Sequence, residues 1–188
     1  MIEKKLLAIL GSPHKRGATG TMLEYAMNIA KQKGWHVDYI HLYEKNIAYC
    51  SGCCACTKTK NCVKQDDMQE ITRLLRECDM VVLAAPVYWG NVPAVVKNMF
   101  DRLFGVAMEE TKTFPKPLFS KKQKYFILTA CHTQAPFDSI FGQSSGAVRN
   151  IKEFFRTGGM TYAGKSVWTG KSKTSMPKHI ERKLKKCF

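Results

Sequence analysis

Five of the eight cysteines of this chain lie within one short segment, at Cys50, Cys53, Cys54, Cys56 and Cys62. Four of them have the spacing C-x2-C-x2-C-x5-C, and Ser51-Gly52 favours a turn after the first. Thiolates gathered in one loop are the ligands of iron-sulfur clusters, and they also suit zinc. The pattern indicates a metal site at Cys50, Cys53, Cys56 and Cys62 with Cys54 as an extra thiol, and a metal-free loop stays open as an alternative.

The length and composition favour a single domain in a reducing compartment. The 188 residues are enough to bury a core without disulfides. No apolar stretch approaches the roughly 20 residues that cross a bilayer, and the N-terminus lacks the pattern of a secretory signal. We therefore expect one cytoplasmic domain over residues 1–188, without a membrane span, whose cysteines bind metal or react rather than form disulfides.

The positive charge is concentrated in the second part of the chain. Residues 1–110 carry 14 Lys and Arg against 12 Asp and Glu, whereas residues 111–188 carry 16 against 3. Such a field attracts phosphorylated cofactors, acidic proteins, nucleic acid or anionic membranes. The basic residues lack the interleaved aromatic residues of a stacking platform, so we expect no specific nucleic-acid binding, although a flavin-free binding module stays open as an alternative.

Apolar runs alternate with helical patterns along the whole chain. Unbroken apolar runs do not show the alternation of half-exposed strands, and they indicate a parallel sheet buried on both faces. The sequence therefore predicts a doubly wound α/β domain with a cysteine loop at 47–65 and an excursion at 105–123. Strands are predicted at 6–10, 37–42, 80–85, 125–130 and 161–168, and helices after Thr19, from Asp66-Asp67, over 95–103, over 148–155 and from Pro177.

Ligands of open α/β sheets bind outside the carboxyl ends of the strands, which points to three loops. The first covers residues 11–19 and leads into a helix N-terminus, where free N–H groups favour an anion such as phosphate. It has neither the P-loop pattern nor G-x-G-x-x-G, and an ordinary Gly/Pro loop is the alternative.

The loops after the third and fourth strands carry aromatic and reactive side chains. Tyr88 and Trp89 at a strand end could pack against a flat ring, and Gly90 would let the backbone approach it. A packed aromatic pair at a subunit interface is the alternative. Cys131 and His132 either end the fourth strand or contact the same ring.

Taken together, these motifs resemble the NADPH-dependent FMN reductase group of the flavodoxin-like fold, and most of all the iron-sulfur flavoproteins. The resemblance covers most of residues 5–170 and implies a five-stranded parallel sheet of order 2-1-3-4-5 with helices on both faces. It rests on Gly11-Ser-Pro-His-Lys-Arg-Gly-Ala-Thr19, on the cysteine loop leading into Asp66-Asp67-Met68, and on Pro86-Val-Tyr-Trp-Gly-Asn91 followed by Lys97 and Asp101-Arg102.

The resemblance implies FMN as the cofactor. His14 and Ala18 stand where the family commonly has arginine and asparagine, while Lys15, Arg16 and the loop N–H groups remain to hold the phosphate. The implied phosphate contacts are Ser12, His14, Lys15, Arg16, Ala18 and Thr19. The implied ring contacts are Pro86, Val87, Tyr88, Trp89, Gly90, Asn91, Ala130, Cys131 and His132.

Two functions follow from the resemblance. In one, NAD(P)H reduces FMN and a small acceptor takes the electrons. In the other, ferredoxin passes electrons through a [4Fe-4S] cluster to FMN. No catalytic residue is assigned, because the flavin carries the chemistry. A homodimer or homotetramer with FMN near a subunit interface is also implied, and the cysteine loop, which follows the second strand, is expected close to the flavin edge.

Overall fold

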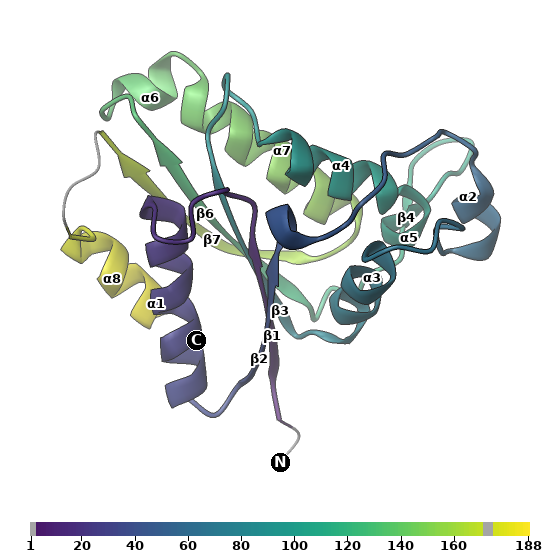
Figure 1. Cartoon of the computed structure of the whole chain (residues 1–188), viewed down its shortest axis with the longest axis horizontal. Helices are drawn as coiled ribbons and strands as arrows, with labels where there is room; N and C mark the ends of the chain where they lie inside the picture. The colour runs from purple at the N-terminus through teal and green to yellow at the C-terminus, as the bar shows by residue number, and fades with distance from the viewer. Residues whose placement is uncertain (1–2, 171–174) are drawn as a thin grey trace.

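Five parallel strands make the central sheet of the computed structural model, which describes residues 3–170 and 175–188. Their spatial order is β2-β1-β3-β6-β7 (Figure 1). Since β6 and β7 are the fourth and fifth strands of this sheet along the chain, the implied order 2-1-3-4-5 is confirmed. The strands are β1 (Lys5–Leu10), β2 (His36–His41), β3 (Met80–Pro86), β6 (Lys124–Cys131) and β7 (Thr161–Thr169).

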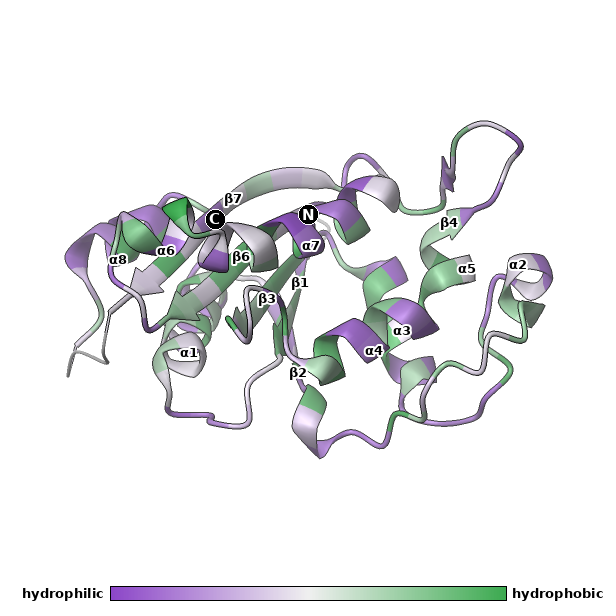
Figure 2. Ribbon diagram, turned by 90° about the horizontal axis from the view of Figure 1, so that it is seen from above, coloured by the Kyte–Doolittle hydropathy of each residue, from purple (hydrophilic) through white to green (hydrophobic). Residues whose placement is uncertain are grey.

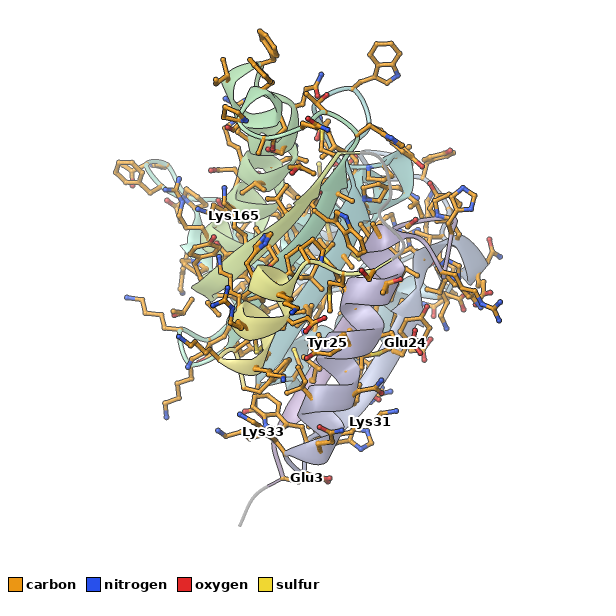
Figure 3. The ribbon with its side chains drawn as sticks, turned by 90° about the vertical axis from the view of Figure 1, so that its left-hand side faces the viewer. Glu3, Glu24, Tyr25, Lys31, Lys33 and Lys165 are labelled. Carbon is orange, nitrogen blue, oxygen red and sulfur yellow. The ribbon has the colours of Figure 1, made fainter. Side chains whose placement is uncertain are left out.

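Helices cover both faces of this sheet. One face packs against α1 (Ala18–Gln32) and α8 (Lys178–Lys185), and the other against α3 (Met68–Glu77), α4 (Ala94–Arg102) and α7 (Gln143–Thr157). Figure 2 shows the apolar strands between these two layers, and Figure 3 looks onto the first layer, where the labelled Glu24 and Lys31 are exposed residues of α1. Over the described ranges, no helix combines the length and the apolar character needed to cross a membrane.

The central strands are buried on both sides, as their unbroken apolar runs predict. In β1, Leu7 and Ile9 belong to the core under α3, α4 and α7, whereas Leu6, Ala8 and Leu10 belong to the core under α1 and α8. All five are at most 1% exposed. Every predicted strand is confirmed, with ends that differ by at most one residue.

The start of α3 differs from the prediction. The helix begins at Met68, so Asp66 and Asp67 precede it instead of forming its first turn. Both carboxylates also have long-range partners. Asp66 pairs with Arg102 of α4 while it accepts from the N–H of Met68 at 3.1 Å, and Asp67 accepts a hydrogen bond from the backbone N–H of Asn46 at 2.6 Å. Asp66 therefore satisfies the first N–H of α3 and holds the neighbouring loop at the same time.

Several short elements were not predicted, because none is long enough to show a period in its apolar residues. The cysteine loop contains one helical turn, and the excursion at 105–123 contains a short antiparallel pair of strands. The short elements are η1 (Leu42–Glu44), α2 (Ala55–Thr59), α5 (Phe104–Ala107), β4 (Met108–Glu109), β5 (Lys116–Pro117) and α6 (Phe137–Ile140).

A buried glutamine closes the C-terminal end of α3. The side-chain amide of Gln123 donates to the carbonyl oxygens of Leu75 and Cys78 at 2.8 and 2.9 Å, and its own oxygen accepts from the N–H of Ser120 at 2.9 Å. The last carbonyls of a helix lack intrahelical donors, so Gln123 satisfies groups that would otherwise be buried without partners.

We predict that Gln123→Leu lowers the free energy of unfolding by about 2 kcal/mol, because it leaves these buried groups unpaired. Gln32→Leu, at an exposed position at the end of α1, is the matched control and should change it by less than about 0.5 kcal/mol. Urea unfolding followed by circular dichroism measures both variants. Equal stability of Gln123→Leu and the wild type would contradict this account.

Candidate functional site

A cavity of about 230 Å³ opens at the carboxyl ends of the parallel strands. The loops after β1, β3 and β6 and the end of β7 all contribute to it, as expected for a ligand site of an open α/β sheet. The lining residues are Ser12, His14, Gly17, Ala18, Thr19, Pro86, Val87, Tyr88, Ala130, Cys131, His132, Trp168 and Gly170.

The loop after β1 wraps around the N-terminus of α1. Ser12 is buried, and its hydroxyl accepts a hydrogen bond from the N–H of His14 at 3.2 Å. A Cβ at Gly20 would lie 1.9 Å from the carbonyl oxygen of Lys15, so only glycine allows the helix to approach the loop this closely. The first N–H groups of α1, which have no intrahelical acceptor, therefore lie beside the cavity and can bind an anion.

A buried histidine holds the same loop from behind. The ring Nε2 of His41, at the end of β2, lies 2.8 Å from the carbonyl oxygen of Ser12. Its Nδ1 is 3.3 Å from Glu44, outside hydrogen-bonding geometry. Glu44 also pairs with Lys15 at 2.5 Å, and that hydrogen bond raises the pKa of Lys15 and lowers the pKa of Glu44. Sequence reasoning missed His41, because the contact joins residues far apart in the chain.

The loop after β3 is a tight turn with an unusual residue at its tip. Tyr88 and Asn91 exchange backbone hydrogen bonds at 2.9 and 3.0 Å, and both residues between them have positive φ, 52° for Trp89 and 70° for Gly90. A bulky residue in the left-handed region is uncommon and strained. The Trp89 side chain is fully exposed, so internal packing does not compensate this strain.

A second cavity of about 390 Å³ adjoins the first. The two share Val87, Cys131 and His132, which therefore stand between them. Gln143 at the start of α7 lies beside this boundary and accepts hydrogen bonds from Thr133 Oγ1 and, at 3.4 Å, from Cys131 Sγ. The second cavity is lined by Val87, Trp89, Gly90, Cys131, His132, Thr133, Phe141 and Gln143.

Most of the residues expected around a flavin therefore lie together. Of the others, Trp89 and Gly90 line only the second cavity, and Lys15, Arg16 and Asn91 line neither. Sequence reasoning missed Gly17, Trp168 and Gly170, although the rule about strand ends also applies to the fifth strand. Trp168 is 4% exposed, and its buried Nε1 has no hydrogen-bond partner in the described part of the chain.

The cysteine loop forms a separate small cavity. Cys50, Cys53, Cys56 and Cys62 line it together with Cys54, Lys64 and Arg102, and its volume is about 20 Å³, room for little more than one water. A hydrogen bond from the N–H of Ala55 is the main cause that lowers the pKa of Cys53. Within the described ranges, no three His, Cys, Asp or Glu side chains are arranged around one metal position. The four thiols border the same small cavity, Cys50 and Cys53 from its exposed side, and their donor chemistry fits a thiolate-bound metal.

Arg102 ties this loop to the end of α4. Its fully buried guanidinium pairs with both carboxylate oxygens of Asp66 at 2.6 and 2.9 Å. Burial alone would raise the pKa of Asp66, but the hydrogen bonds from Arg102 and from backbone N–H groups lower it below its usual value. Buried charges are stable only when paired in this way.

The cysteine cavity and the strand-end cavity lie apart. They share no lining residue, and Arg102 is at the far end of α4 from the loop after β3. Nine helical residues span about 13 Å. Figure 1 likewise shows α2 away from the carboxyl ends of β6 and β7. Within one chain, the cysteine loop therefore does not border the strand-end cavity.

Some known proteins are similar to this chain in sequence, and others are similar to it in fold. An iron-sulfur flavoprotein of Archaeoglobus fulgidus is 43% identical over 99 residues, which cover 53% of this chain and 45% of that protein. One of Clostridioides difficile is 28% identical over 185 residues, covering 96% and 75%. The chain thus spans about half the length of the first of these relatives.

Among solved structures, an FMN-dependent NADH-azoreductase from Bacillus anthracis, in complex with FMN, has the same fold, with a TM-score of 0.72 and 13% identity over 98% of this chain and 95% of that one. The family model described as NADPH-dependent FMN reductase matches residues 4–172. With the strand-end cavity and the order of the strands, this match shows that the chain belongs to the NADPH-dependent FMN reductase family.

Proposed function

We propose that this protein is an oxidoreductase that binds FMN in the strand-end cavity and passes electrons from NAD(P)H to a small acceptor. The observation that carries the proposal is the cavity itself, which joins a helix N-terminus, Tyr88 at the start of the aromatic turn and the strand-end His132 in one place. FMN, when bound, accepts hydride from NAD(P)H and gives up the electrons to the acceptor.

The chain's own residues would hold the two ends of FMN differently. The loop from Ser12 to Thr19 suits the phosphate, because helix N–H groups and the helix dipole favour an anion. Pro86, Val87 and Tyr88 suit the ring on one side, and Ala130 to His132 on the other. The buried N–H of Trp168 supports this fit, since it is a donor that lacks an acceptor.

The adjoining cavity suits the second substrate. It borders the proposed ring position at Val87, Cys131 and His132, and it is open toward the exposed Trp89 and Phe141. A nicotinamide or an aromatic acceptor could pack there against the ring. The same exposed aromatic residues would suit a subunit interface in a homodimer or homotetramer.

The second candidate is an electron carrier in which a [4Fe-4S] cluster at Cys50, Cys53, Cys56 and Cys62 exchanges electrons with ferredoxin and FMN. The observation that favours it is that all four cysteines line one small cavity. The curated relatives named iron-sulfur flavoprotein support it as well. Soft thiolates suit iron-sulfur clusters and zinc, so metal analysis has to distinguish them.

Anaerobic purification followed by flavin, iron and sulfide analysis and by NADPH and NADH titrations tests both candidates. We expect one FMN per chain and bleaching of the flavin absorbance by NADPH or NADH. Bleaching by reduced ferredoxin but by neither nicotinamide would favour the carrier. A protein that cannot take up FMN would contradict the proposal.

We predict that Trp168→Phe weakens FMN binding about fivefold, which corresponds to the loss of one hydrogen bond of about 1 kcal/mol. The FMN-free variant should lose little stability, because the removal of a buried donor without a partner offsets part of the cost of the smaller ring in the core. Flavin fluorescence titration measures the first effect and urea unfolding the second. Unchanged FMN affinity would show that Trp168 does not contact the cofactor.

A further inference from the structure

Arg102 contacts the cysteine loop at three separated points. Its Nε–H donates to Cys62 Sγ at 3.2 Å, and its Nη1 donates to the carbonyl oxygen of Ala48 at 2.6 Å. The third point is Asp66, which also accepts from the N–H groups of Ala48 and Met68, each at 3.1 Å. One buried guanidinium therefore holds the chain before the first cysteine, at the last one, and after it.

The five cysteines are held unequally. Cys62 is fixed by Arg102, and Cys56 packs against α5 so closely that a Cβ at Gly105 would lie 2.4 Å from its carbonyl oxygen and 2.9 Å from its sulfur. Cys50, Cys53 and Cys54 are exposed. The loop thus has two anchored thiols on the protein side and three on the solvent side.

We propose that Arg102 is the positioning residue of the cysteine site, and that Cys62 is the ligand it holds ready for the metal. This inference rests on the metal centre of the second candidate function. A guanidinium N–H fixes the direction of the Cys62 sulfur and places positive charge beside an anionic ligand set. Metal binding then has to order only the exposed cysteines, because Cys56 and Cys62 are already held. The loss of conformational entropy that opposes metal binding is therefore smaller.

Another arginine provides a matched control. Arg76 of α3 donates to Asn61 Oδ1 at 2.9 Å and to the carbonyl oxygen of Lys60 at 2.5 Å, so it also holds the cysteine loop, immediately before Cys62. It has no hydrogen bond to a sulfur among the described residues. Arg76→Lys therefore loosens the loop without removing a contact to a ligand, whereas Arg102→Lys keeps the charge and removes the Nε–H that Cys62 accepts.

The test is a titration of the metal-free protein with Co²⁺, in which the thiolate-to-cobalt absorbance measures binding. We expect Arg102→Lys to bind Co²⁺ about 10- to 100-fold more weakly than the wild type, the usual effect of losing a partner of a metal ligand. Arg76→Lys should stay within about threefold. Equal weakening by the two variants, or wild-type affinity of Arg102→Lys, would overturn the role of Arg102.

Cysteine variants keep the test decisive if Arg102→Lys does not fold. Cys62→Ser should weaken Co²⁺ binding at least about tenfold more than Cys50→Ser, because the exposed Cys54 can replace Cys50, whereas no other thiol accepts a hydrogen bond from Arg102 among the described residues. An equal or larger effect of Cys50→Ser would overturn the inference. A wild-type protein that gives neither a thiolate-to-cobalt signal nor, after anaerobic reconstitution with Fe²⁺ and sulfide, the visible absorbance of a cluster would overturn the metal centre and Arg102's role in it, and would leave the proposed FMN site standing.

Discussion

Helix α4 packs so closely against the end of β1 that residue 11 has no room for a side chain. A Cβ at Gly11 would lie 2.3 Å from Val96 Cγ2, and the Gly11 N–H donates to Ala84 of β3 at 2.7 Å. This contact sets where the loop after β1 begins and where α4 runs. The N-terminus of α4 comes shortly after the turn from Tyr88 to Asn91, and Arg102 at its C-terminus holds the cysteine loop. Both candidate sites therefore depend on the position of one helix.

Buried polar groups then shape each site. His41 holds the Ser12 carbonyl behind the first loop, and Arg102 with Asp66 holds both ends of the cysteine loop. A buried polar group costs free energy unless it is paired, so each pair favours one loop geometry over its alternatives. Trp168 differs from Arg102 and Asp66, because its buried Nε1–H has no acceptor among the described residues.

The strands could be predicted from the sequence, because a run such as Leu6 to Leu10 can only be buried on both faces. Their order was implied by the resemblance to the family. Most of the residues that line the strand-end cavity could also be predicted, because parallel strands bring their carboxyl ends to one edge of the sheet. Arg102 could not be placed in this way. Its role depends on contacts with Ala48 and Asp66, 54 and 36 residues away, which no local pattern reveals. The position of the cysteine loop depends on the same long-range contacts. It was expected beside the flavin, whereas it lies at the end of α4 that is far from the loop after β3.

The central claim is that the loop after β1 and the N-terminus of α1 form the phosphate end of a flavin cavity. Calorimetric titration of the flavin-free protein with FMN and with riboflavin, which differ only in the phosphate, tests it most directly. FMN should bind at least about 100-fold more tightly, with a margin that shrinks as salt concentration rises, because several N–H groups and a helix dipole act on the phosphate. Equal affinities for the two flavins would contradict the account.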